Sequence, residues 1–102
     1  MEAQVAVFGI LRFPPENIKK LLPYLKEFIA ATYENDKCIK YKVAEDILEP
    51  GLLRFSELWQ NKESLEKHLK ASHIEPWRAK SKEYGLIERE FTAYKITDSG
   101  PV

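Results

Sequence analysis

The hydrophobic pattern of the chain predicts four strands and two helical regions. Runs of β-branched and aromatic residues, or strict alternation of apolar and polar positions, indicate strands. Apolar residues spaced three and four apart indicate amphipathic helices. On these criteria we expect strands over residues 5–13, 39–46, 52–59 and 88–97, a first helix from Glu16 to about Asp36, and a second helical region from Asn61 to about Tyr84.

The second helical region carries signals for a break in its middle. Asn61 is a suitable N-cap, so the first segment is expected to run to Ala71. Ser72 is followed three residues later by Glu75, the spacing of a capping box, which predicts a new helix starting at His73 and ending before Gly85. In the first helix, Pro23 predicts a kink rather than two separate helices.

The predicted order is β-α-β-β-α-β, which is the ferredoxin-like arrangement of the α+β class with a four-stranded antiparallel sheet. We expect one domain over residues 1–97 and a flexible tail at 98–102. The helices should cover one sheet face, but the other face also carries apolar residues such as Leu58. Since both faces need cover, the sequence predicts a homodimer packed sheet to sheet.

Composition excludes several classes of protein. The 102 residues include 16 basic and 16 acidic ones, interleaved along the chain, so a nucleic-acid partner is not expected. The apolar stretch after the N-terminus is too short for a membrane span or a signal peptide, and Cys38 is the one cysteine, which together favour a cytoplasmic protein. The four scattered glycines form no nucleotide-binding loop, so we expect no nucleotide cofactor.

Glu57 is the first candidate for chemistry. It lies in the middle of a predicted strand on the same face as Phe55 and Trp59, so it should point beneath the helices, where an unpaired charge is costly. It is either a general base or substrate acceptor, or a structural acid paired with a neighbouring group.

The two histidines are the next candidates. His68 lies at the margin of its helix's inward face, where a neutral imidazole could remove a phenolic proton or simply pack in the core. His73 follows after the predicted break and does not share a helical face with His68, so we predict no metal. We place His73 at the helix junction and expect it to contact the substrate from the edge of the site.

Aromatic residues could hold a flat ligand. Trp59, at the end of its strand and in phase with Glu57, and Phe55 are candidates for stacking, although both types also fill cores. Tyr41 could offer its hydroxyl to a ligand or be buried with that hydroxyl bonded internally.

The chain resembles the antibiotic biosynthesis monooxygenase family over nearly its whole length. The likeness is carried by the Val5 strand, Asp36 to Tyr41, Glu57-Leu58-Trp59, Leu65-x-x-His68-Leu69, Ser72-His73 and the last strand. Lys37 departs from the family, whose members often have glycine at that place in the loop.

This resemblance implies a dimeric α+β barrel with a pocket between sheet and helices. In several members such a pocket oxidises quinol-like or anthrone-like aromatics with dioxygen, using neither metal nor flavin. On that basis Trp59 and Phe55 would flank the ring, while His68 or Glu57 would take the proton. Related barrels that degrade haem use an Asn in the first strand and a His after the position of His73; this chain has neither, which disfavours haem. An isomerase of small carbonyl compounds and a binding domain without turnover remain the alternatives.

Overall fold

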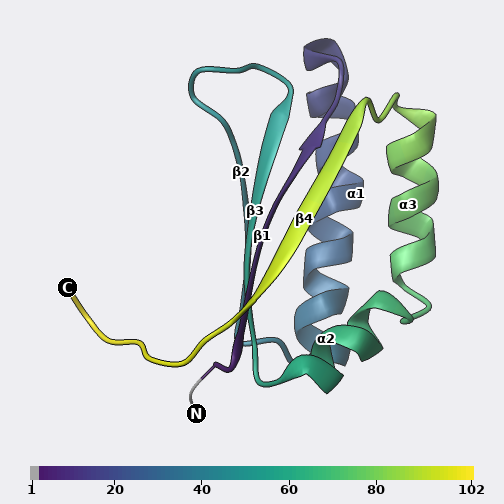
Figure 1. Cartoon of the computed structure of the whole chain (residues 1–102). Coiled ribbons are helices and arrows are strands. Elements are labelled where there is room, and N and C mark those ends of the chain that lie inside the picture. Colours follow the sequence, from purple (N-terminus) through teal and green to yellow (C-terminus); the bar gives the residue numbers. More distant parts are fainter. Residues whose placement is uncertain (1–2) are drawn as a thin grey trace.

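The computed structural model describes residues 3–102 and has the predicted order of elements. Figure 1 shows a single sheet with all of the helices on one of its sides. The elements are β1 (Val5–Arg12), a 3-10 turn (Pro15–Asn17), α1 (Ile18–Ala31), a π-helical turn η2 (Thr32–Asp36), β2 (Lys40–Glu45), β3 (Leu52–Trp59), α2 (Lys62–Leu69), α3 (Ile74–Glu83) and β4 (Glu88–Lys95).

The sheet is antiparallel throughout, with the strands in the order β2-β3-β1-β4. Its register places residues that are distant in sequence in rows that face the helices. One such row consists of Tyr41, Glu57, Val7 and Ala93, since each of these residues is paired with the next. This arrangement confirms the predicted α+β class and ferredoxin-like topology.

The core lies between the sheet and the helices. Helix α1 buries one side against the sheet through Ile18, Leu21, Leu25 and Phe28, which follow the three-and-four spacing of an amphipathic helix. The helix runs without interruption through Pro23, so a single helix is confirmed at that position. No helix among residues 3–102 is both long enough and apolar enough to span a membrane.

The ends of the second helical region differ in part from the prediction. Asn61 caps α2 as expected: its side chain accepts a hydrogen bond from the backbone N–H of Ser64, and Ser64 completes a capping box. The predicted box at Ser72 is absent, because α3 begins one residue later than expected, after His73, and has no side-chain cap. The helix break itself is confirmed.

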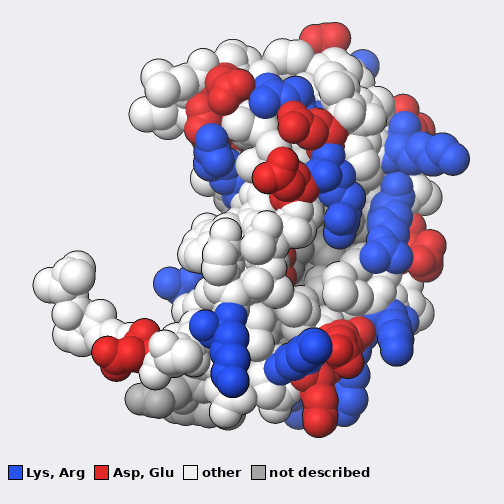
Figure 2. Space-filling view, viewed as in Figure 1, with Lys and Arg blue, Asp and Glu red and all other residues white. Residues whose placement is uncertain are grey.

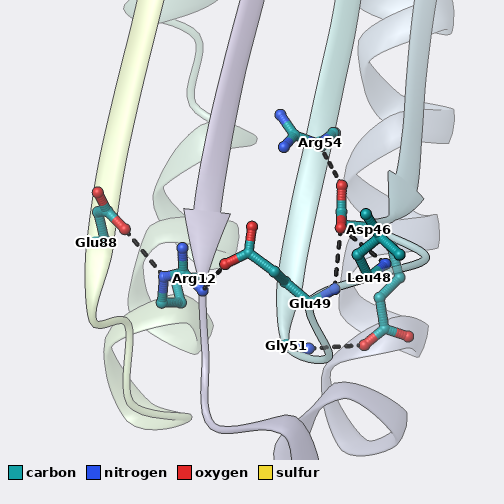
Figure 3. A network of polar contacts seen from close by, with 8 residues as sticks. Arg12, Asp46, Leu48, Glu49, Gly51, Arg54 and Glu88 are labelled. Atoms are coloured by element: carbon teal, nitrogen blue, oxygen red, sulfur yellow. Dashed lines mark hydrogen bonds and ion pairs between the residues drawn. The ribbon is translucent and has the colours of Figure 1, made fainter.

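The turn between β2 and β3 is held by a network of ionic and polar contacts, shown in Figure 3. Asp46 pairs with Arg54 at 2.7 Å and accepts two backbone N–H groups of the turn. Arg12 bridges Glu49 and Glu88, which ties the turn to β1 and β4. These contacts fix a turn whose two apolar residues, Ile47 and Leu48, are almost fully exposed.

Candidate active site

A cavity of about 560 Å³ lies between the sheet and the helices, within the size range of small-molecule sites. It opens between β4 and α3, and Figure 2 shows a hollow there. On this side the inward-facing Ala93 remains exposed, because no helix covers it. The residues that matter most for its chemistry are Tyr41, Glu57, His68, Phe28, Phe55, Phe91, Trp77, Arg78, Lys82 and Arg89.

The Glu57 carboxyl lines the cavity from the middle of β3, where it is only 4% exposed. Its Oε1 accepts a hydrogen bond of 2.9 Å from the indole Nε1–H of Trp59, two residues along the same strand face. Burial raises the pKa of Glu57 to about 7, and the Trp59 bond and the positive charge of Arg89 oppose that rise. A carboxyl with such a pKa can both accept and return a proton near neutral pH.

His68 and Asp36 form a buried pair. His68 lies on α2, is 3% exposed and has its Nδ1 at 2.6 Å from Oδ2 of Asp36, the last residue of η2. A carboxylate at that distance keeps the proton on Nδ1, and Nε2 then carries the lone pair. Burial lowers the pKa of His68, and Asp36 opposes this, so the ring is held neutral and oriented.

The second nitrogen of His68 is the one available to a ligand. Among residues 3–102 it has no hydrogen-bond partner, and the ring lines the cavity. The arrangement resembles the histidine and aspartate of a hydrolase triad, in which a carboxylate orients an imidazole whose other nitrogen acts as a base.

His73 contacts the same carboxylate from the other side. Its Nε2 lies 3.0 Å from Oδ2 of Asp36 and 3.4 Å from the hydroxyl of Thr32. Asp36 therefore contacts both imidazoles, which holds η2 against the junction of α2 and α3. His73 is not among the residues that line the cavity, which corrects the expectation that it contacts the substrate.

Tyr41 lies beside Glu57 on the neighbouring strand and also lines the cavity. Burial raises the pKa of its phenol, so the hydroxyl stays protonated. Within the described residues this hydroxyl makes no hydrogen bond, although Tyr33 bonds to the backbone of Tyr41. A neutral donor that lines a cavity suits a developing negative charge on a ligand oxygen.

The aromatic wall depends on a glycine in the central strand. Phe91 packs against Phe55 edge to face, with ring centroids 5.2 Å apart, and its ring lies directly over Gly9 between them. A Cβ on Gly9 would lie 2.2 Å from Cδ2 of Phe91. Glycine is therefore what allows this ring to lie against the sheet.

The structure brings together most of the residues singled out from the sequence. Glu57, His68, Phe55 and Tyr41 all line one cavity. Trp59 does not, which corrects its assignment as a stacking surface: it is 0% exposed, covered by His68 at a ring-centroid distance of 4.8 Å. Its part in the site is the hydrogen bond to Glu57.

The two histidines lie closer together than the sequence predicted. They do not share a helical face, but the break between α2 and α3 returns the chain, so their ring centroids lie 6.0 Å apart and both contact Asp36. Helix phase within one helix could not show this, because His73 lies in the junction before the next helix.

Asp36 is the residue of the candidate site that sequence reasoning missed. It stood at the expected end of the first helix, where acidic residues are common at the surface. The one signal was indirect, since a buried histidine needs a partner for its second nitrogen. Lys37, which follows it, has the left-handed backbone of φ 52° and ψ 41°, a conformation that explains why glycine suits this position.

Asp36, His68 and His73 are also the kinds of ligand that bind divalent metals, and one ligand atom from each lies within 4.8 Å of the others. The 2.6 Å separation between His68 and Asp36 is that of a hydrogen bond to a protonated ring nitrogen, and His73 lies 3.0 Å from the same carboxylate oxygen. A metal bound to both His68 and Asp36 would have to replace the proton between them.

Comparison with known proteins places this architecture in one family. The antibiotic biosynthesis monooxygenase family model matches residues 5–80. The chain is similar to a protein of Deinococcus radiodurans described as a "putative antibiotic biosynthesis monooxygenase", with 26% identity, a TM-score of 0.88, and 96% of this chain and 97% of that chain covered. No protein of curated function matches the sequence.

Two further structures show the same fold at lower identity. A conserved protein from Methanosarcina mazei Go1 is 24% identical, with a TM-score of 0.82 and coverage of 91% of this chain and 92% of that one. A Caulobacter crescentus CB15 protein is 14% identical, with a TM-score of 0.87 and coverage of 95% and 92%. By its family match and its fold, the chain belongs to the antibiotic biosynthesis monooxygenase family.

Proposed function

We propose that the protein is a cofactor-independent monooxygenase that oxidises a small electron-rich aromatic, such as a quinol or an anthrone, with dioxygen. The observation that carries the proposal is the His68 and Asp36 pair, which presents an oriented basic nitrogen to an apolar cavity. Family membership supports the reaction class.

The first step is removal of a proton from the bound aromatic. The lone pair on Nε2 of His68 takes the proton, and Asp36 stabilises the imidazolium that forms. The Tyr41 hydroxyl donates a hydrogen bond to the resulting phenolate or enolate oxygen. Deprotonation makes the aromatic electron-rich enough to reduce dioxygen directly.

The oxidation needs no other reductant. The substrate anion passes one electron to dioxygen, and the radical pair combines to form a carbon–oxygen bond and a peroxide. The peroxide O–O bond then breaks as the same carbon loses its remaining hydrogen. One oxygen atom stays on the product, the other leaves as water, and all four electrons come from the substrate.

Loss of water requires a proton donor, and Glu57 is suited to this task. With a pKa of about 7 it is partly protonated at neutral pH, and it lines the same cavity as His68. The Trp59 indole holds one of its oxygens in place. The two groups thus divide the proton transfers between base and acid.

Oxygen consumption with a panel of quinols and anthrones tests the proposal. His68→Gln removes the base, and we expect its rate to fall by about 10² to 10⁴ relative to the wild type. Asp36→Asn leaves His68 in place without its orienting charge and should lose about 10²-fold or more. His73→Gln is the matched control, because it removes the other imidazole on Asp36 but no group that lines the cavity.

The proposal fails if no substrate of the panel is consumed faster than its blank, which would leave a binding domain without turnover. Conversion of a small carbonyl substrate under nitrogen would instead indicate an isomerase. A His73→Gln rate as low as that of His68→Gln would show that the cluster works as a unit rather than through the His68 nitrogen.

We also propose that the protein is a homodimer joined through the uncovered sheet face. Phe8 and Tyr94 lie there, each 53% exposed, with ring centroids 6.0 Å apart. The β2–β3 turn and the C-terminal tail both extend toward that side, so the face is concave (Figures 1 and 2). A second copy would cover these apolar side chains and those of Ile47 and Leu48.

Light scattering at micromolar concentration tests the dimer. The wild type is expected at twice the chain mass, and Phe8→Ser with Tyr94→Ser should shift it toward the monomer. The same pair of changes leaves the cavity-lining residues intact. A wild-type monomer would refute this interface.

A further inference from the structure

The mouth of the cavity carries a concentration of positive charge that the chain as a whole lacks. The sequence has equal numbers of basic and acidic residues. The lining, in contrast, includes three cationic side chains, Arg78, Lys82 and Arg89, and one carboxyl, Glu57. Since the pKa of Glu57 is about 7, even that carboxyl is partly neutral at physiological pH.

These cations come from two elements that line the cavity, and the charge of Arg78 is near enough to lower the pKa of His68. Arg78 and Lys82 are one turn apart on α3, and Arg89 is on the facing side of β4. Figure 2 shows basic side chains bordering the hollow on the α3 side and above it, with an acidic group among those above. An anion entering between β4 and α3 would therefore meet cations from two elements.

Two of the three charges are free to bind an anion. Arg78 pairs with Glu75 at 3.3 Å. Lys82 has no ion pair among residues 3–102, and the guanidinium of Arg89 lies over the Phe91 ring, 4.8 Å from its centroid. That stacking holds Arg89 at the end of the aromatic wall, where its N–H groups can bind a carboxylate.

The register separates the backbone of Arg89 from that of Glu57, although the charge of Arg89 still acts on the Glu57 carboxyl. Arg89 is level with Leu11 and Leu53, four residues along β3 from Glu57 and two strands across. At about 3.3 Å per residue and about 4.8 Å per strand, the two Cα atoms lie roughly 16 Å apart. The Phe55 and Phe91 rings occupy the sheet face between them.

We propose that the ligand of this cavity is an aromatic acid: its ring lies on the Phe55 and Phe91 wall, and its carboxylate binds Arg89 and Lys82. The proposal rests on the proposed function only in taking this cavity as the binding site. It adds that the substrate carries a permanent negative charge, remote from the carbon that reacts near Glu57 and His68. That charge anchors and orients the ring, which a purely apolar pocket cannot do.

A matched pair of probes tests this inference without any oxidation. The compounds 2-naphthoate and 2-naphthamide have the same ring and differ in charge, and neither has a phenol to oxidise. Binding is measured by quenching of tryptophan fluorescence, since Trp77 lines the cavity. We expect the wild type to bind the carboxylate about tenfold more tightly at low salt, the effect of a partly exposed charge-assisted hydrogen bond.

The variant Arg89→Gln with Lys82→Gln should reduce that ratio to about twofold or less. Lys19→Gln with Lys26→Gln, an equal loss of two charges at exposed sites on α1, should leave it unchanged. Raising the salt concentration to about 0.15 M should also lower the ratio of the two affinities for the wild type, because salt screens such charges. Equal affinity for both probes, no binding of either, or a ratio kept in the double variant would overturn the inference, whereas failed oxygen consumption would not.

Discussion

Replacing Glu57 by Gln should stabilise the protein at alkaline pH and have little effect at acidic pH. The change keeps the size of the side chain and an oxygen that can accept the 2.9 Å bond from Trp59. It removes only the ability to carry a charge. The carboxyl is 4% exposed, so its charge is poorly solvated in the folded protein and freely solvated in the unfolded chain.

The magnitude follows from the pKa of Glu57, which is about 7 in the folded protein against an ordinary value of 4.5. The difference of about 2.5 corresponds to roughly 3 kcal/mol, at about 1.36 kcal/mol for each pKa unit. Between these two values the folded state binds more protons than the unfolded state. The contribution of Glu57 to the free energy of unfolding is therefore fully present below pH 4.5 and is lost as the pH rises to about 7.

Urea unfolding at pH about 5 and about 8.5, followed by tryptophan fluorescence at one protein concentration, measures the effect. Roughly 2.5 kcal/mol of the difference between Glu57→Gln and the wild type should develop between these two conditions. Glu27→Gln, the same change at an exposed site on α1, should show no such dependence. If the Glu57→Gln difference is the same at both pH values, the carboxyl is not held neutral by burial and the reasoning is refuted.

Four other outcomes can be checked separately. Chelation with EDTA followed by gel filtration should leave oxygen consumption unchanged; a loss restored by a divalent metal would contradict the hydrogen-bonded pair. Gly9→Ala should displace Phe91 and cost about 1–3 kcal/mol of stability, and the cost should shrink in a Phe91→Ala background; thermal unfolding that shows no cost would refute the contact. Trp59→Phe should raise the pKa of Glu57 further, since it removes a hydrogen bond that lowers this pKa; a lower pKa, measured by carbon-13 NMR of the carboxyl, would contradict this. Lys37→Gly should stabilise by about 1 kcal/mol, because φ there is 52°, and a lower urea midpoint would argue against this.

Local patterns were sufficient for the strands, the helices and the inward face of β3. Alternation alone placed Phe55, Glu57 and Trp59 on one side, because side chains on a strand alternate strictly. The pattern could not show which of them would reach the cavity. Trp59 and Glu57 share a face of the strand. His68 of α2 covers the Trp59 indole, whereas the Glu57 carboxyl lines the cavity.

The sequence by itself determined the order of elements, the α+β class and a buried carboxyl beneath the helices, since these depend on periodicity and on neighbours along the chain. Only the tertiary structure decided that Asp36 is the partner of His68. The two residues are 32 positions apart and meet at 2.6 Å, a contact that forms only when η2 packs against α2. The neutral composition likewise could not show that basic residues gather at the cavity. Lys82 and Arg89 line the same cavity only because α3 and β4 come together in the fold.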